Sequence, residues 1–403
     1  MTPRHPRFPL FDSLRAIAAC SVLLFHVGFV LEGFESDTFG RYVTQLNIGV
    51  AIFFVISGFL LYRPFVQARF SGDPPPALVP YAIRRAFRIL PAFWVVLPLA
   101  ALWLSLDEVF DRPLIHFGLL QAYQRDTLTT GLGYAWTLTI EISFYAMLPV
   151  VAYLLRQVPA RSTRRLVLTE GALLAAMFAF SLVWNITQTQ SHRGFILFTP
   201  EIATLPAFLD HFALGMGLAV ASVALAGRAT MPAAVRVVER HPWVPWLVAA
   251  GAWLWLCNVG DGFAIADGET RRHELRGLVA VCLLMPAVFG QGAGGLVRRL
   301  LASRPMLWLG LVSYSLYLWH PPIARKVAET HLDEDHGWLP AALAIVALSI
   351  AVAVVSYNLV ERPAMWAGRH LARRAGRREP PEAVAAGAGA GLGSPATEAP
   401  VER

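Results

Sequence analysis

The sequence predicts an all-α membrane protein, a bundle of about ten transmembrane helices with no appended soluble domain. Of its 403 residues, 56% are hydrophobic and only 15% are charged, whereas about a quarter of the residues of soluble proteins are charged. The apolar residues gather in runs of about 20, which is long enough to cross a bilayer as a helix. The charged residues gather between these runs, as expected for loops at the membrane surface.

Each predicted span is one such apolar run. In chain order the spans fall at residues 14–32, 46–62, 90–106, 135–155, 166–185, 203–226, 243–259, 276–291, 305–323 and 338–360. Residues 1–365 are therefore expected to form one transmembrane domain. Residues 366–403 turn to Arg and then to Ala, Gly, Pro and Glu, with too little large apolar surface to fold, and predict a disordered cytoplasmic tail.

The distribution of basic residues tests the number of spans, because a missed helix would invert every later loop. With ten spans, 24 Lys and Arg residues lie on the side of both termini and 9 on the other side. The positive-inside rule then places both termini in the cytoplasm and the protein in the inner or plasma membrane as a multi-pass protein in contact with lipids. The net charge of +7 follows from this topology, so a nucleic-acid partner is not expected.

The first span carries two ionisable side chains, Arg15 and His26. Eleven steps of about 100° bring the helix back to within about 20° of its starting direction, so both residues lie on one face, about 16 Å apart. A charge at the bilayer centre costs roughly 2.5 to 3.5 kcal/mol on insertion scales, and such residues usually face a cavity or the bundle interior. We interpret this polar stripe as functional.

The second span contains the small residues Gly49, Ser57 and Gly58 within an apolar run. Small residues let the backbones of two membrane helices approach closely. On its own this pattern predicts only close packing.

An arginine pair precedes the third span. Arg85 and Arg88 are three residues apart and so lie on one side of a short helix, and Pro91 suits the entry into the span that follows. One interpretation is ordinary positive-inside anchoring. The other is a phosphate clamp, because arginine makes bidentate contacts with phosphate and a cytoplasmic cluster could hold a nucleotide-bearing donor.

Glu141 lies in the first turns of the fourth span, about 8 to 10 Å below the outer surface if the helix begins near Trp136. A structural hydrogen-bond anchor, protonated or not, is one explanation. The other is a partnership with His26, since the two residues fall at similar depths on the predicted topology.

The ninth span ends with Ser313, Tyr314, Tyr317 and His320. Tyr317 and His320 share a helical face, and this group is a candidate substrate-binding set. The alternative is an interfacial belt of aromatic residues with a structural histidine. Glu361, which closes the tenth span, is expected to pair with a basic loop and carries no predicted chemistry.

The three cysteines, Cys20, Cys257 and Cys282, have no zinc-site spacing. We therefore expect no bound metal.

Taken together, these motifs resemble those of the bacterial membrane-bound acyltransferases of the acyltransferase 3 type. The resemblance spans roughly residues 10 to 363. It rests on segments in family order: Asp12-Ser13-Leu14-Arg15 with His26, the run from Phe53 to Gly58, Arg85 and Arg88 with Pro91, Trp136-Thr137-Leu138 through Glu141 to Phe144-Tyr145, Leu214-Gly215-Met216, Ser313-Tyr314 to His320, and Glu361-Arg362-Pro363. Thr137 stands where the family usually has Ser, and the hydroxyl is retained.

The resemblance implies a ten-helix core that moves an acyl group, often acetyl, from cytoplasmic acyl-coenzyme A to a hydroxyl of a glycan, lipid or small molecule. On this hypothesis Arg85 and Arg88 hold the coenzyme A phosphates and Arg15 guides the donor. Neutral His26 acts as the general base, and Glu141 orients or stabilises its imidazolium. Some members also carry a hydrolase-like domain, without which this chain would act alone or with a partner.

A proton-coupled transporter or flippase is the alternative, because intramembrane Arg, His and Glu also make proton relays. The two hypotheses differ over the arginine pair, since a transporter has no use for coenzyme A. Internal repeats would favour transport, and the two halves of the chain show no convincing correspondence.

Overall fold

The computed structural model describes residues 8, 10–31, 39–160, 162–191, 199–228, 230–258, 266–290 and 295–378. Within these ranges the regular secondary structure is entirely helical, as predicted. The α-helices are α1 Leu10–Val30, α2 Gly40–Val43, α3 Ile48–Ser71, α4 Leu78–Leu104, α5 Glu108–Asp111, α6 Pro113–Phe117, α7 Trp136–Gln157, α8 Thr163–Ser191, α9 Leu209–Ala224, α10 Ala233–Arg240, α11 Trp243–Asn258, α12 Ala266–Val288, α13 Leu296–Leu301, α14 Arg304–Ala328, α15 Leu332–His336, α16 Trp338–Ser356 and α17 Arg362–Arg378.

A helix occupies each of the ten predicted spans, but the number of crossings stays a prediction. Among the described residues, seven helical segments are long and apolar enough to cross a membrane by length and composition: Leu10–Val30, Gly40–Ser71, Leu78–Leu104, Gly133–Gln157, Thr163–Gln188, Leu205–Ala224 and Trp338–Gly376. The other three predicted spans correspond to α11, α12 and α14. Helix α11 has only 16 residues, and the first half of α12 is rich in charged residues.

Two predicted boundaries differ from the structure. Helix α4 begins at Leu78, so Arg85, Arg88 and Pro91 belong to one continuous helix and not to a short helix before a span. The predicted disordered tail is helical in its first part, because α17 continues to Arg378 and packs along α4. Residues 379–403 of that predicted tail lie outside the described residues.

The outer faces of the long helices expose large apolar side chains, as expected for a surface that faces lipid. Monomeric soluble proteins rarely expose large contiguous apolar patches to water. Examples come from helices all around the bundle: Leu102, Val150, Leu168, Val183, Leu247 and Leu343. Together with the apolar helices, this surface identifies a multi-pass membrane protein.

Helix α3 lies in the interior and packs against α1, α7, α9 and α12. The contact with α9 depends on two glycines that face the opposite backbone. A Cβ at Gly58 would overlap the carbonyl oxygen of Phe212, and a Cβ at Gly215 would overlap the carbonyl oxygen of Val55. Gly49 approaches the backbone of α1 at Ala18 in the same way. The predicted close packing of the second span is therefore confirmed.

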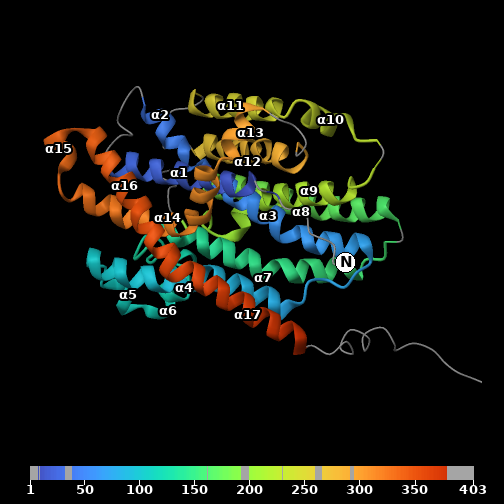
Figure 1. Cartoon of the computed structure of the whole chain (residues 1–403), viewed down its shortest axis with the longest axis horizontal. Coiled ribbons are helices and arrows are strands. Elements are labelled where there is room, and N and C mark those ends of the chain that lie inside the picture. The colour runs from blue at the N-terminus through green and yellow to red at the C-terminus, as the bar shows by residue number, and fades with distance from the viewer. Residues whose placement is uncertain are drawn as a thin grey trace, which may run out of the picture.

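The long helices run largely along one direction (Figure 1). The short helices α5, α6 and α15 lie at one end of the molecule, opposite the C-terminal end of α17 (Figure 1). Helix α14 packs between α1 and α16 and also contacts α4. This arrangement brings α1, α3, α4, α7 and α14 around a common interior.

We expect Gly215→Ala to lower the free energy of unfolding by about 1 to 3 kcal/mol, because the added methyl group must displace the α3 backbone. Thermal unfolding of the purified protein in detergent measures this change. Gly171→Ala on α8 is the control, since a Cβ there meets open space and alanine favours a helix by about 1 kcal/mol over glycine. Equal unfolding temperatures for both variants would contradict the packing argument.

Candidate functional site: two adjoining cavities

The interior of the bundle holds a cavity of about 350 Å³ that collects most of the predicted site residues. We call it the arginine cavity. Its lining residues include Arg15 from α1, Ser57 from α3, Arg85 and Arg88 from α4, Thr137, Glu141 and Tyr145 from α7, and Ser313, Tyr314 and Tyr317 from α14. Four helices from the first half of the chain and α14 from the second half thus meet around one polar space.

Three guanidinium groups line this cavity, and each is held by a different contact. Arg15 donates to Asp12 over 3.1 Å. Arg85 lies over the ring of Tyr145 at 5.9 Å from its centroid, and its Nε has no hydrogen-bond partner among the described residues. Three cations at one cavity, one with an unused donor, form a site suited to a phosphate-bearing ligand.

Arg88 is anchored to a carboxylate at the end of the bundle core. Its Nη1 lies 3.4 Å from Glu361 Oε1, and Ser315 donates to Glu361 Oε2 over 2.9 Å. Glu361 closes a π-helical turn, Tyr357–Glu361, between α16 and α17, and such turns are frequent at functional sites. Glu361 was expected to pair with a basic loop; it pairs with a basic residue, but that residue, the predicted donor-binding Arg88, lies within helix α4.

Glu141 belongs to the arginine cavity. Its Oε1 accepts a hydrogen bond from Ser57 over 3.0 Å and another from the hydroxyl of Tyr145. Among the described residues it makes no hydrogen bond with His26. Glu141 therefore lies beside the arginines, where its carboxylate partly balances their charge. The structure does not bring together the expected pair of Glu141 and His26.

A second cavity, of about 520 Å³, adjoins the first, and we call it the histidine cavity. His26 of α1 lines it together with aromatic side chains and a polar group from α9 and α12. These lining residues include Phe25, Phe29, Tyr134, Trp136, Phe208, His211, Glu269, His273 and Arg276. Most of its wall is apolar, as is usual for a site that binds an organic ligand.

His26 is paired with His320, which is fully buried. Nδ1 of His26 lies 2.9 Å from the carbonyl oxygen of Val22 and 3.1 Å from Nε2 of His320. Nδ1 of His320 lies 3.0 Å from the carbonyl oxygen of Leu316. Because a carbonyl only accepts, both Nδ1 atoms carry hydrogen in the neutral rings. Nε2 of His26 then holds the lone pair that a general base needs.

Tyr317 stands at the boundary between the cavities. The two cavities share three lining residues, Val50, Thr137 and Tyr317. The hydroxyls of Thr137 and Tyr317 are hydrogen-bonded to each other, and Tyr317 also donates to the carbonyl oxygen of Tyr134 over 2.8 Å. This hydroxyl pair forms a thin partition between the arginines and His26.

The other residues of the predicted substrate-binding set have two positions: two line the arginine cavity, and one contacts His26. Ser313 donates to the carbonyl oxygen of Gly310 and Tyr314 to that of Ile89, each over 2.8 Å. Both line the arginine cavity. His320 contacts Nδ1 of His26 through its own Nε2. These residues therefore gather at the interior site, which differs from the position expected of an interfacial aromatic belt.

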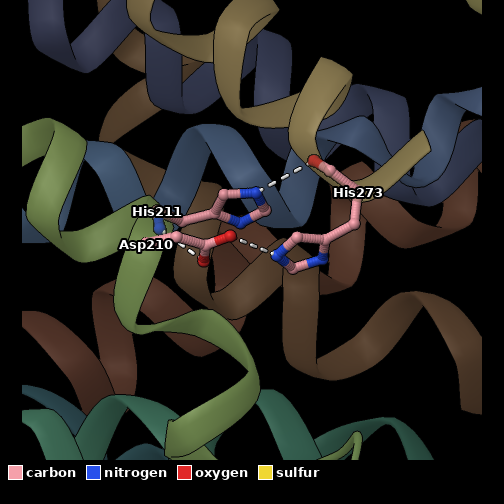
Figure 2. Close-up of side chains that lie close together, drawn as sticks. All are labelled: Asp210, His211 and His273. Atoms are coloured by element: carbon pink, nitrogen blue, oxygen red, sulfur yellow. Dashed lines mark hydrogen bonds and ion pairs between the residues drawn. The ribbon is translucent and has the colours of Figure 1, made fainter. Parts of the chain in front are cut away.

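A buried group on the wall of the histidine cavity escaped the sequence analysis: Asp210, His211 and His273 (Figure 2). Their ligand atoms lie within 4.8 Å of one another, as in a metal site. The two imidazole rings, however, are stacked at 4.2 Å with an angle of 9° between their planes. A bound ion lies in the plane of each imidazole ligand, so these parallel rings cannot both coordinate one ion in this conformation.

Asp210 and His211 are adjacent in the sequence, but their partner His273 is 62 residues beyond His211. No spacing rule connects positions on α9 and α12, which are separated by α10 and α11. The signal that was available is the presence of two ionisable residues, Asp210 and His211, inside the predicted span 203–226.

A family profile described as an acyltransferase domain matches residues 9–358. The exopolysaccharide production protein ExoZ of Rhizobium meliloti is 29% identical over 340 residues, which cover 82% of this chain and 93% of the relative. The peptidoglycan O-acetyltransferase OatA of Listeria monocytogenes is 26% identical, covering 90% of this chain and 57% of the relative.

The O-acetyltransferase OatA of Staphylococcus aureus is 24% identical, covering 89% of this chain and 57% of the relative. The chain thus spans little more than half the length of the two O-acetyltransferases and nearly all of ExoZ. No solved structure matches the chain.

We expect Glu361→Ala to lower the free energy of unfolding by about 1 to 3 kcal/mol, because it leaves Arg88 and Ser315 without their shared acceptor. Glu361→Gln should have a smaller effect, since its amide oxygen can still accept from Ser315. Thermal unfolding in detergent compares the two variants. An alanine variant as stable as the wild type would show that the Arg88 contact contributes nothing to the fold.

Proposed function

The chain belongs to the acyltransferase family whose profile matches residues 9–358, and on this premise we propose that it transfers an acyl group from acyl-coenzyme A to a hydroxyl of a glycan. We propose acetyl as the group and the plasma membrane as the location, with both termini in the cytoplasm. Peptidoglycan and exopolysaccharide in the names of the relatives support a hydroxyl-bearing glycan as the acceptor.

The observation that carries this proposal is that two cavities meet at Tyr317, one lined by three arginines and the other, mostly apolar, by His26. One side offers cations and the other a neutral histidine with a free lone pair. A transferase needs this division, because a phosphate-rich donor and a neutral sugar must be held by different chemistry and still meet at one bond.

On the donor side, Arg15, Arg85 and Arg88 would hold the phosphates of coenzyme A. The unused Nε of Arg85 supports this role, since a buried donor without a partner is costly unless a ligand satisfies it. The apolar wall beside the arginines, which includes Phe53, Phe54 and Leu61, suits the pantetheine arm. The thioester would then reach the partition at Thr137 and Tyr317.

On the acceptor side, Nε2 of His26 would remove the proton from the sugar hydroxyl as its oxygen attacks the thioester carbonyl. The new C–O ester bond forms, the C–S bond breaks, and the proton passes to the departing thiolate to give free coenzyme A. His320 keeps the proton of His26 on Nδ1 and so holds the base in the correct tautomer. We propose direct transfer, without a covalent acyl-enzyme, and the alternative is an acyl group bound to the histidine.

A proton-coupled transporter or flippase is the competing proposal. It would also use buried Arg, His and Glu, but it would release no coenzyme A thiol. The release of this thiol from acetyl-coenzyme A in the presence of a glycan acceptor, by purified protein, therefore separates the two.

We expect His26→Ala to reduce acyl transfer by about 10²- to 10⁴-fold, the usual contribution of a general base. The measurement is the rate of thiol release in the presence of an oligosaccharide acceptor. His370→Ala, an exposed histidine on α17, is the control and should retain full activity. Full activity in the His26 variant would refute the proposed mechanism.

We expect the double variant Arg85→Ala and Arg88→Ala to raise the KM for acetyl-coenzyme A by about 10²- to 10⁴-fold, because two charged hydrogen bonds are lost and each is worth about 1.5 to 3 kcal/mol. Binding of radiolabelled acetyl-coenzyme A measures the same loss directly. Arg84→Ala is the matched control, since Arg84 is exposed on the same helix and does not line the cavity. Unchanged donor binding in the double variant would contradict the phosphate clamp.

A further inference from the structure

We propose that Asp210, His211 and His273 form the acceptor-recognition site of the histidine cavity, where a sugar hydroxyl donates a hydrogen bond to His273. This inference rests on the proposed function and goes further, because it assigns the sugar to a particular wall of the cavity. His211 and His273 line the same space as His26, so a ligand bound to them lies beside the base.

The three residues join the start of α9 to the first turns of α12 (Figure 2). The carboxylate of Asp210 is fully buried. It accepts hydrogen bonds of 2.7 Å from the backbone N–H of His211 and from Nε2 of His273. A buried carboxylate is costly unless such donors satisfy it, so the position of the His273 ring is strongly determined.

These contacts also determine which atom of His273 is left for a ligand. Because Nε2 donates to Asp210, the neutral ring carries its lone pair on Nδ1. Among the described residues, the hydrogen bond of the His273 side chain is made through Nε2 alone. Burial lowers the pKa of His273 and the Asp210 carboxylate raises it, with a net rise, so Nδ1 is an available acceptor above that pKa, on a residue that lines the cavity.

His211 fixes the group from the other side. Its Nε2–H donates to the carbonyl oxygen of His273 over 3.2 Å, and its ring stacks on that of His273. Nδ1 of His211 is a buried atom with no partner among the described residues. Gly277 leaves room for this ring, since a Cβ there would come within 2.9 Å of it. The lone pair on Nδ1 of His211 is thus buried, and the acceptor left for a ligand is Nδ1 of the neutral His273.

Nδ1 of His273 can accept a hydrogen bond and Arg276, which lines the same cavity, can donate one, so this wall suits a ligand that does both, and a sugar hydroxyl is such a group. The adjacent aromatic surface suits the apolar face of a sugar ring. Phe208 lies 5.1 Å from the His273 ring and 5.6 Å from Trp136, centroid to centroid, and all three line the cavity. Acceptor atoms beside an aromatic platform are the features that a hexose requires.

The test is His273→Gln, because the glutamine NH₂ group can still donate to Asp210 while the Nδ1 acceptor is removed and the amide oxygen stands at a different position. Initial rates are measured with acetyl-coenzyme A and a panel of soluble oligosaccharides, chitotetraose, cellotetraose and xylotetraose. We expect the KM for the accepted oligosaccharide to rise about tenfold, the effect of one lost hydrogen bond. The KM for acetyl-coenzyme A should stay within about twofold, which a general structural defect would not allow.

His116→Gln is the matched control. His116 is also a buried histidine, burial lowers its pKa and so keeps it neutral, and it lines neither of the two cavities. It should change neither KM. If His273→Gln fails to accumulate in the membrane, Asp210→Asn is the second variant, since it keeps the side-chain volume and weakens the orientation of His273.

An unchanged KM for the oligosaccharide in the His273 variant, or equal changes in both KM values, would overturn the inference. Wild-type protein that binds acetyl-coenzyme A but acylates none of the oligosaccharides would also overturn it and would leave the donor site standing. Wild-type protein that binds no acyl-coenzyme A would instead refute the proposed function.

Discussion

The constraint on which this structure depends is the cost of placing ionised side chains among apolar helices. The bundle meets it by pairing the charges across helices. Arg69 contacts Glu170 at 2.6 Å between α3 and α8, Arg88 contacts Glu361, and Asp210 is held by two donors. Removing one partner of a buried pair costs more than the pair itself contributes. These pairings therefore help to determine how each helix is rotated about its own axis.

Close helix packing determines the positions of these polar groups. Gly58 and Gly215 bring α3 and α9 together, and Gly310 does the same for α14, where a Cβ would overlap the backbone of Asp12. Small residues at such contacts replace the hydrophobic driving force that lipid cannot provide. Because α1, α3 and α14 are locked at backbone distance, the side chains that project between them meet in small, defined cavities.

Helical periodicity predicted the site in part. It correctly placed Arg15 and His26 on one stripe of α1, and in the structure this stripe faces both cavities. It also suggested Glu141 as the partner of His26, since both were expected at similar depths. In the structure, Glu141 instead accepts hydrogen bonds from Ser57 and Tyr145. Two residues at a similar depth in the membrane need not lie on helix faces that point toward each other.

The sequence by itself determined the helical class, the approximate positions of the apolar helices, and the residue types available for chemistry, because these follow from composition and from the 3.6-residue period. Only the tertiary structure decided which side chains meet. It paired His26 with His320, placed Tyr317 between two cavities, and joined Asp210 to His273. The physical reason is that these contacts connect helices far apart in the chain, and their rotation is set by packing across the whole bundle.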